Sequence, residues 1–268
     1  MVNSSAPLRA AAPVAPAAVP AAGNRPMKTE FYQRTAYRLS EMPVPNCFLK
    51  LDEHFDLHLD PRIPREGGTH IALLLAESIC ARMADVEMYG YLMDDTRRRH
   101  RMDRDGDAKV AILTRSFLIG YFGAARALLD SGAATLATLF ELDLERPYRT
   151  FGSAEFWQKF VTRAPNPYRR YHPMRIFFAE VLRWTNETVD RVPPLEAMRA
   201  LFGQYSTREA HLKILDEGAV DLERLPKERR PLAWIDPLTL HDRWKPQFLS
   251  LCEKLCTEIA NSVTTREP

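Results

Sequence analysis

The sequence contains few cysteines and no marked excess of either charge. Only four of its 268 residues are cysteine, and none of them belongs to a Cys-x-x-Cys pair. Since 46% of the residues are hydrophobic and can supply a core, a disulfide framework is not expected, and a reducing cytoplasm is the expected environment. Lysine and arginine number 37 against 35 aspartate and glutamate, so any electrostatic partner must recognise a local patch.

Long hydrophobic runs are also missing. The most apolar stretch, residues 71–81, contains Glu77 and falls well short of the roughly 20 residues that a membrane-spanning helix needs. We therefore expect no membrane partner. Residues 1–26 are rich in alanine and proline, and prolines at short intervals interrupt any signal-peptide core, so a disordered tail is predicted there.

The motifs that carry most hydrolytic and cofactor chemistry are not found. The sequence has no Gly-x-Ser-x-Gly, Walker, Gly-x-Gly-x-x-Gly or His-Glu-x-x-His segment. No two of its seven histidines stand at metal-ligand spacing on a predicted helix. Residues 103–107 resemble a calcium loop, but their glycine comes fourth instead of sixth. No cofactor and no metal are expected.

The sequence does contain many helical patterns, in which apolar residues recur at intervals of three and four. Ser131-Gly132 is predicted to end one long helix, and Ser153 to cap another. Helices are predicted from Thr69 to about Thr96 or beyond, at 108–130, at 133–142, from Ser153, within 171–191, at about 194–203, at 206–217 and at 245–263.

Two regions have weaker patterns. Phe55, Leu57 and Leu59 alternate with polar residues, which predicts an extended segment lying across a helical body. Prolines in 218–243 predict a loop. The expected fold is therefore an all-α helical bundle with an extended N-terminal segment and additional C-terminal helices. Its parts are a tail (1–26), an irregular segment (27–69), a bundle (70–192) and a helical extension (193–268).

Cys252 and Cys256 stand four residues apart on a predicted helix, a spacing that could provide half of a metal site. They belong to an amphipathic run with Phe248, Leu255 and Ile259. We predict that both are buried core thiols.

The helical stretch 171–191 combines an apolar face with a short polar one. The apolar face comprises Met174, Phe177, Phe178, Val181, Leu182, Thr185 and Val189. Arg183, Asn186, Glu187 and Asp190 share the polar face. A bundle helix that buries one side and offers a site on the other has this pattern. Pairing of Arg183 with Glu187 one turn later is the structural alternative.

Two basic clusters could bind the phosphates of a nucleic acid. Arg97, Arg98, Arg99 and Arg101, with Arg104 nearby, form the first. Five aspartates between 94 and 107 balance these five arginines, which favours a solvated helix end held by salt bridges.

The second cluster is Tyr168-Arg169-Arg170-Tyr171-His172, directly before the helix that carries Arg183. Aromatic rings next to arginines can stack bases and hold phosphates. The same side chains could instead pair with local carboxylates at the beginning of a helix, and the sequence leaves both interpretations open.

Three segments in order carry a family resemblance: SFLIGYFGAARALLDSGAATLATLF, then FWQKF, then LRWTNETVDR. Together they make residues 70–192 similar to the HEPN superfamily, helical bundles of toxin–antitoxin, phage-defence and RNA-processing systems. In that family an arginine, often followed by a polar residue, precedes a histidine, with four to six residues between the two. The resemblance implies metal-independent RNA cleavage at an interface between two protomers.

On this resemblance Arg183 takes the arginine position and Asn186 the polar position, but Asp190 stands where the family has histidine. An exposed carboxylate, with a pKa near ~4, is ionised and repels the scissile phosphate, whereas an imidazole can transfer a proton near neutral pH. The resemblance thus implies a non-cleaving protein that binds RNA, a nucleotide or a protein partner and forms a homodimer through the face carrying Arg183.

Two alternatives stay open. The protein could be an active ribonuclease that combines Arg183 with another histidine, such as His172 or one from a partner chain. It could instead be a structural interaction protein with no nucleic-acid role.

Overall fold

The computed structural model describes residues 42–58, 71–102, 107–186 and 237–264, together with Tyr37 and the short segments 214–215 and 234–235. The elements in chain order are α2 (Asn46–His58), α3 (Ile71–Met102), α4 (Asp107–Leu139), η2 (Arg146–Tyr148), α5 (Ala154–Arg163), α6 (Pro165–Tyr171), η3 (His172–Met174), α7 (Arg175–Asn186), β1 (Ile214–Leu215), β2 (Trp234–Ile235) and α11 (Pro237–Thr264). The two strands are two residues long and pair antiparallel. The predicted all-α bundle is confirmed.

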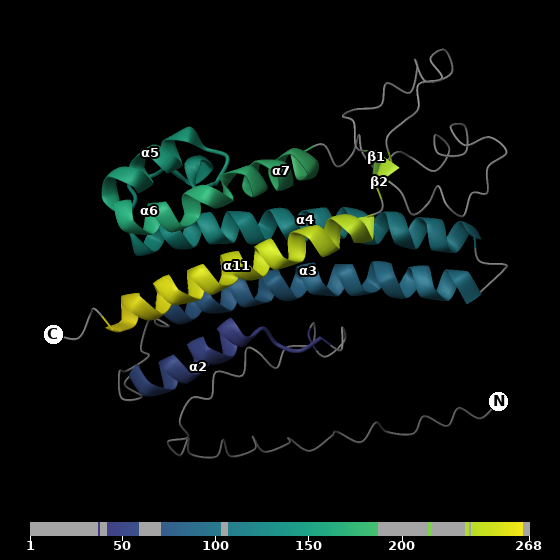
Figure 1. The fold of residues 1–268 in the computed structure, drawn as a ribbon, viewed down its shortest axis with the longest axis horizontal. Coiled ribbons are helices and arrows are strands. Elements are labelled where there is room, and N and C mark those ends of the chain that lie inside the picture. Colours follow the sequence, from purple (N-terminus) through teal and green to yellow (C-terminus); the bar gives the residue numbers. More distant parts are fainter. Residues whose placement is uncertain are drawn as a thin grey trace, which may run out of the picture.

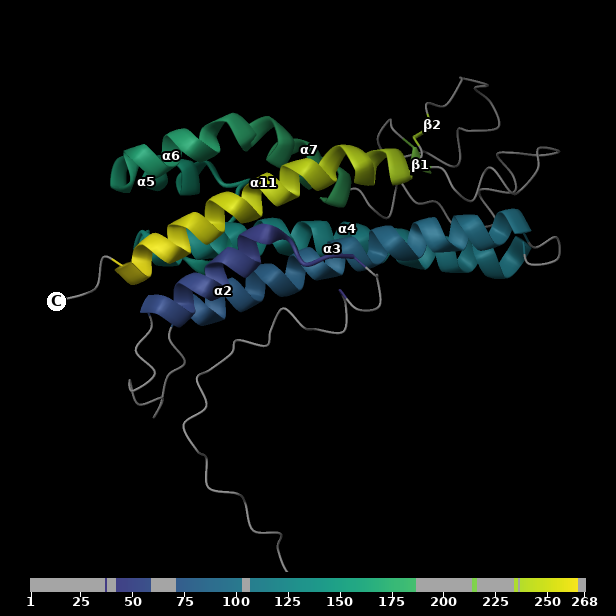
Figure 2. The ribbon, with the colours of Figure 1, turned by 60° about the horizontal axis from the view of Figure 1, so that its bottom comes forward.

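The long helices α3 and α4 form the antiparallel pair on which the other helices pack (Figure 1). Helix α11 lies along both of them and also contacts α2. Helix α7 packs on α4, with α5 and α6 beside it, while α2 lies on the opposite side of α11 (Figure 2). This arrangement separates an α5–α7 side from an α2 side.

Large aromatic side chains join these layers. Trp184 of α7 stacks on Phe122 of α4, with 6.1 Å between ring centroids, and Trp244 of α11 lies 6.2 Å from the same phenylalanine. All three side chains are buried. Such aromatic pairs add to the hydrophobic free energy of the area they bury, so this contact fixes α7 and α11 on α4.

The prediction of an extended segment at Phe55–Leu59 was wrong for the described residues, because Asn46–His58 is helical. Phe48, Leu51 and Phe55 are buried at a spacing of three and four, whereas Leu57 is 80% exposed. The alternation that indicated a strand included Leu57, which is not part of the buried face. The helical periodicity of the three buried side chains decided the structure.

The predicted break at Ser131-Gly132 was also wrong, because α4 continues without interruption to Leu139. A Cβ atom on Gly132 would stand 3.2 Å from Leu255 Cδ1 and 3.4 Å from the ring of Phe151. Glycine here permits close packing of α11 and of the turn at Phe151 against α4. Glycine in a helix interior indicates such an approach as well as a helix end.

Near the C-terminus, α11 begins at Pro237, earlier than the predicted 245. Proline suits the first position of a helix, where its missing N–H is not needed, and the buried Leu240 and Trp244 extend the apolar face of the later turns. Ile214 and Leu215 are in β1, not in the predicted helix 206–217. The predicted tail 1–26 and the predicted helix 194–203 lie outside the described residues. None of the described helices combines the length and hydropathy needed to cross a membrane.

Candidate functional site

Helix α7 buries one face and exposes the other, as the sequence predicts. Its buried side chains are Phe177, Phe178, Val181, Leu182 and Trp184. The opposite face continues a row of exposed residues that begins on α6 and η3. This row, which we term the α6–α7 strip, comprises Arg169, His172, Ile176, Ala179, Arg183 and Asn186. Their spacing of three and four places them along one side of consecutive helical turns.

The two described residues of the family-like motif differ in their surroundings. Arg183 is exposed and makes no ion pair with any described residue, whereas Glu187, its candidate partner, lies outside the described part. Asn186 is held by Arg126 of α4, whose Nη1 donates to its Oδ1 at 2.5 Å. Asp190 also lies outside the described residues. The structure thus places Arg183 and Asn186 together on the α6–α7 strip.

Two arginines of the first basic cluster form ion pairs with aspartates of the same helix, α3. Arg98 pairs with Asp94, and Arg99 pairs with Asp95 at 2.8 Å. Both pairs join residues four apart on α3, and both arginines are largely exposed. Exposed pairs of this kind contribute little to stability, but they occupy the guanidinium groups. The side chain of Arg101 lies outside the described part.

The second basic cluster divides into one bound and one unpaired arginine. Arg170 forms an ion pair with Glu258 of α11 at 2.5 Å, and the Glu258 side chain is buried. Arg169 is exposed and forms no ion pair within the described segments. The rings of Tyr168 and His172, one helical turn apart, lie 5.1 Å from each other between centroids. The structure therefore assigns Arg170 to the fold and leaves Arg169 accessible.

A third arginine lies near the same strip. The Arg175 guanidinium stands 5.1 Å from the centre of the Trp157 ring, a cation–π distance. This contact holds the stem of an exposed arginine against α5 without neutralising its charge. Sequence patterns did not identify Arg175, because its partner ring belongs to another helix.

A second group of residues forms where the four cysteines come together in the fold. Cys47 on α2, Cys80 on α3, and Cys252 and Cys256 on α11 influence one another electrostatically. Cys80, Cys252 and Cys256 are buried, as predicted for the last two, whereas Cys47 is partly exposed. The cysteines lie far apart in the chain, so spacing alone gave no signal of this convergence.

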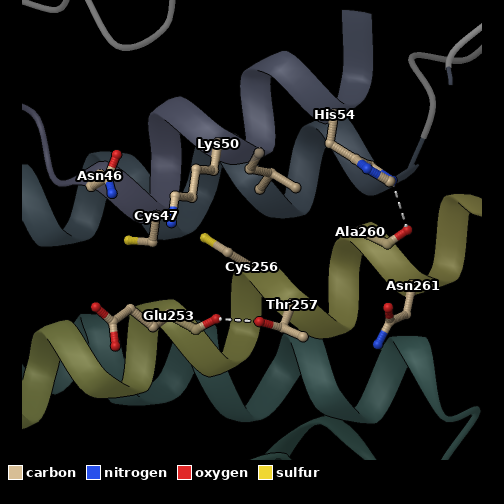
Figure 3. A pocket seen from close by; sticks show the side chains of 10 residues that line it. Asn46, Cys47, Lys50, His54, Glu253, Cys256, Thr257, Ala260 and Asn261 are labelled. Carbon is tan, nitrogen blue, oxygen red and sulfur yellow. Dashed lines mark hydrogen bonds between the residues drawn. The ribbon is translucent and has the colours of Figure 1, made fainter. Parts of the chain in front are cut away.

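Cys47 and Cys256 line a pocket of about 360 Å³ between α2 and α11. Figure 3 shows the sulfur atoms of Cys47, from α2, and Cys256, from α11, at the same end of the gap between the two helices. The Lys50 side chain also extends into this gap. His54 Nε2 donates to the carbonyl oxygen of Ala260 at 3.2 Å and connects the helices at the other end of the pocket. The remaining lining residues are Asn46, Leu51, Glu253, Thr257 and Asn261.

The two pocket thiols differ in acidity. A hydrogen bond from the Cys256 thiol lowers the pKa of Cys47, whereas burial and the Glu253 carboxylate oppose this change. The backbone N–H groups of Phe48 and Cys47 at the beginning of α2 lower the pKa further. The same hydrogen bond and burial raise the pKa of Cys256. Cys47 is therefore the more readily ionised thiol of the pair.

Within the described segments, no three His, Cys, Asp or Glu side chains gather as they would around a metal ion. The pocket thus offers two thiols, one cation, one carboxylate and amide groups, but no metal-ligand set. Comparison with protein-family models, with curated proteins and with solved structures finds no match to this chain.

Proposed function

We propose that the protein is a non-cleaving RNA-binding protein that contacts the phosphate backbone through the α6–α7 strip. The supporting observation is the contrast among its arginines. Arg169 and Arg183 are exposed and lack an ion pair with described residues, whereas Arg98, Arg99 and Arg170 are held by carboxylates. Guanidinium groups that are not already paired can take up phosphate without first breaking a salt bridge.

The neighbouring side chains suit a single-stranded ligand. The exposed His172 ring lies against the half-buried ring of Tyr168, which itself packs on Trp157 and Phe160. An exposed ring such as that of His172 can stack on an unpaired base. Arg175 is exposed and keeps its charge while it contacts the Trp157 ring of α5. An RNA strand running along α6 and α7 would thus meet arginines at both ends of the strip and the exposed His172 ring near one end.

The arrangement favours binding over cleavage. Metal-independent cleavage needs a proton-transfer group within hydrogen-bond reach of the reacting atoms. Among the described residues, the histidine nearest to Arg183 along the strip is His172, three helical turns away, and His241 is buried against Tyr121. The sequence position of the family's histidine holds Asp190.

Fluorescence anisotropy with a labelled single-stranded oligoribonucleotide tests the proposal across a range of salt concentrations. We expect R169A/R183A to bind roughly tenfold more weakly, with a slope of log affinity against log salt that is shallower by about 1.4, since each lost phosphate contact on a single strand removes about 0.7. The matched control is R98A/R99A, which removes two arginines that are already paired and should bind like the wild type.

Two results would refute the RNA proposal. One is no binding by the wild type at physiological salt, which would favour the structural interaction protein. The other is equal weakening of RNA binding in both double variants, which would show that binding depends on the net charge of the protein and not on the unpaired arginines. Intact RNA after incubation with EDTA is also expected. Cleavage that disappears in Arg183→Ala would instead support the ribonuclease alternative.

The homodimer is a separate proposal that follows from the family resemblance. Ile176 is 84% exposed in the middle of the α6–α7 strip, so a second copy that met the strip would bury this side chain. If two copies meet there, light scattering at micromolar concentration should give twice the chain mass, and Ile176→Glu should give the monomer. A monomeric wild type would exclude the dimer and leave RNA binding to its own test.

A further inference from the structure

The pocket between α2 and α11 brings together two thiols with unequal access to solvent. Cys47 is partly exposed, whereas the Cys256 side chain is only 5% exposed. Both thiols line the same pocket, and Figure 3 shows their side chains extending into the gap between α2 and α11. A disulfide between them would connect two helices that already pack on each other.

The size of the pocket indicates the kind of molecule that could reach Cys47. Its volume of about 360 Å³ is roughly ten times the space of one water molecule, far more than a peroxide needs. Lys50 provides a positive charge at the pocket and Glu253 a negative one, and the amide of Asn46 can exchange hydrogen bonds with a polar ligand. A small organic molecule that carries an amide together with groups of both charges fits this lining.

We propose that Cys47 and Cys256 form a thiol–disulfide exchange pair, in which Cys47 attacks a low-molecular-weight disulfide bound in this pocket and Cys256 then releases the attached thiol. The proposal is independent of RNA binding, since the pocket lies on the α2 side and the α6–α7 strip on the other side of α11 (Figure 2).

The reaction balances in two exchange steps. The Cys47 thiolate attacks one sulfur of the small disulfide, a new sulfur–sulfur bond forms, and one small thiolate leaves and takes up a proton. The Cys256 thiol then attacks the Cys47 sulfur and gives its proton to the second departing thiolate. The two protein thiols are oxidised by two electrons to a disulfide, and the small disulfide is reduced to two thiols.

The surroundings set the order of the two steps. Cys47 is partly exposed, and the neighbouring Cys256 thiol together with the N-terminal amides of α2 lowers the pKa of Cys47 despite burial and the nearby Glu253 carboxylate. Cys256 is buried and more weakly acidic, so it cannot begin the reaction with a bulky disulfide but lies in position to complete it. Cys80 and Cys252 do not line the pocket and take no part.

The test treats the reduced full-length protein with oxidised glutathione and follows it by intact mass and by peptide mapping without reductant. The wild type should form a Cys47–Cys256 disulfide and retain no glutathione. Cys256→Ser should accumulate one glutathionyl group on Cys47, and Cys47→Ser should show neither product. The matched control Cys252→Ser removes a buried thiol outside the pocket and should react like the wild type.

The wild-type peptide map decides the matter even if a variant fails to fold. A disulfide between other cysteines, or labelling of Cys47 no faster than that of Cys252, would overturn the proposal. We expect Cys47 to react faster by at least on the order of tenfold. Loss of the adduct in Cys256→Ser would likewise exclude Cys256 as the group that releases the bound thiol.

Discussion

Arg170 of α6 and Glu258 of α11 form an ion pair, with 2.5 Å between the arginine Nη2 and the glutamate Oε1. The Glu258 side chain is 5% exposed, whereas that of Arg170 is 46% exposed. Burial raises the pKa of Glu258, and the nearby guanidinium opposes this change. The pair connects the α5–α7 side of the molecule to α11 and distinguishes Arg170 from its exposed neighbour Arg169.

Replacement of Arg170 by alanine should therefore reduce stability. The substitution leaves the buried Glu258 carboxylate without its cation, and we expect a loss of about 1–3 kcal/mol in the free energy of unfolding, because half of the arginine already contacts water. Urea denaturation measures this change. Arg169→Ala is the matched control and should alter stability by less than about 0.5 kcal/mol. Equal losses in the two variants would contradict the structural role of the pair.

Gly90 and Gly123 should respond in opposite ways to alanine. A Cβ on Gly90 would lie 2.5 Å from the ring of His241, which is buried and has its Nδ1 3.4 Å from the Tyr121 hydroxyl. Gly90→Ala should thus cost about 1–3 kcal/mol through overpacking. Gly123 is exposed in α4, and a Cβ there would meet nothing within 4 Å.

For that reason Gly123→Ala should raise the free energy of unfolding by about 0.5–1 kcal/mol, the difference in helix propensity. Thermal unfolding of both variants followed by circular dichroism provides the comparison. A stabilising Gly90→Ala would show that the His241 ring can move aside at no cost.

Asp52 should make stability depend on pH. Burial, and then the charges of Asp56 and Glu53, raise the pKa of Asp52 from 3.8 to about 6. The folded state therefore binds this proton more tightly than the unfolded chain does, so the free energy of unfolding should fall as the pH rises between these two values. One carboxylate oxygen of Asp52 is buried with no hydrogen-bond partner among the described residues, which agrees with this direction.

The substitution Asp52→Asn should remove this part of the pH dependence. Relative to the wild type, the variant should be more stable near neutral pH and closest to it below about pH 4, where both side chains are uncharged. Urea midpoints at several pH values measure the difference. Asp143→Asn, at an exposed position, serves as the control and should follow the wild type. A constant difference across the pH range would refute the raised pKa.

Ser153 should contribute to stability as the N-cap of α5. Its hydroxyl oxygen accepts a hydrogen bond from the backbone N–H of Phe156 at 3.3 Å. Ser153→Ala removes the acceptor and should cost about 1 kcal/mol, whereas Ser153→Asp retains one and should cost little. Chemical denaturation distinguishes the two. Similar losses for alanine and aspartate would attribute the effect to the turn at 151–153.

The sequence predictions were right where a feature depends on residues close together in the chain, and wrong where it depends on contacts between different helices. The Ser153 cap and the buried face of α7 depend on residues within one or two helical turns, and the sequence predicted both. The continuity of α4 through Gly132 depends on Leu255, which belongs to another helix, and the sequence failed there. In α2 the alternation around Leu57 was a chance pattern, which packing of the opposite face overrode.

For the candidate sites, too, the sequence identified groups that are neighbours in the chain but not contacts that form only on folding. The sequence identified Arg169 and Arg170 as one basic cluster, since they are neighbours in the chain. It could not separate them, because Glu258 reaches only one of them after folding. It also could not predict that Cys47 would meet Cys256, because no local spacing relates α2 to α11.

What the sequence determined by itself is the all-α fold, since the apolar spacing, the caps and the absence of long alternating runs act through local backbone preferences and the burial of one helix face. Only the tertiary structure decided which arginines stay unpaired on the α6–α7 strip and which cysteines share a pocket. Charge pairing and thiol chemistry depend on distances of a few ångström, and those distances are set by the packing of α11 against α2, α3 and α4.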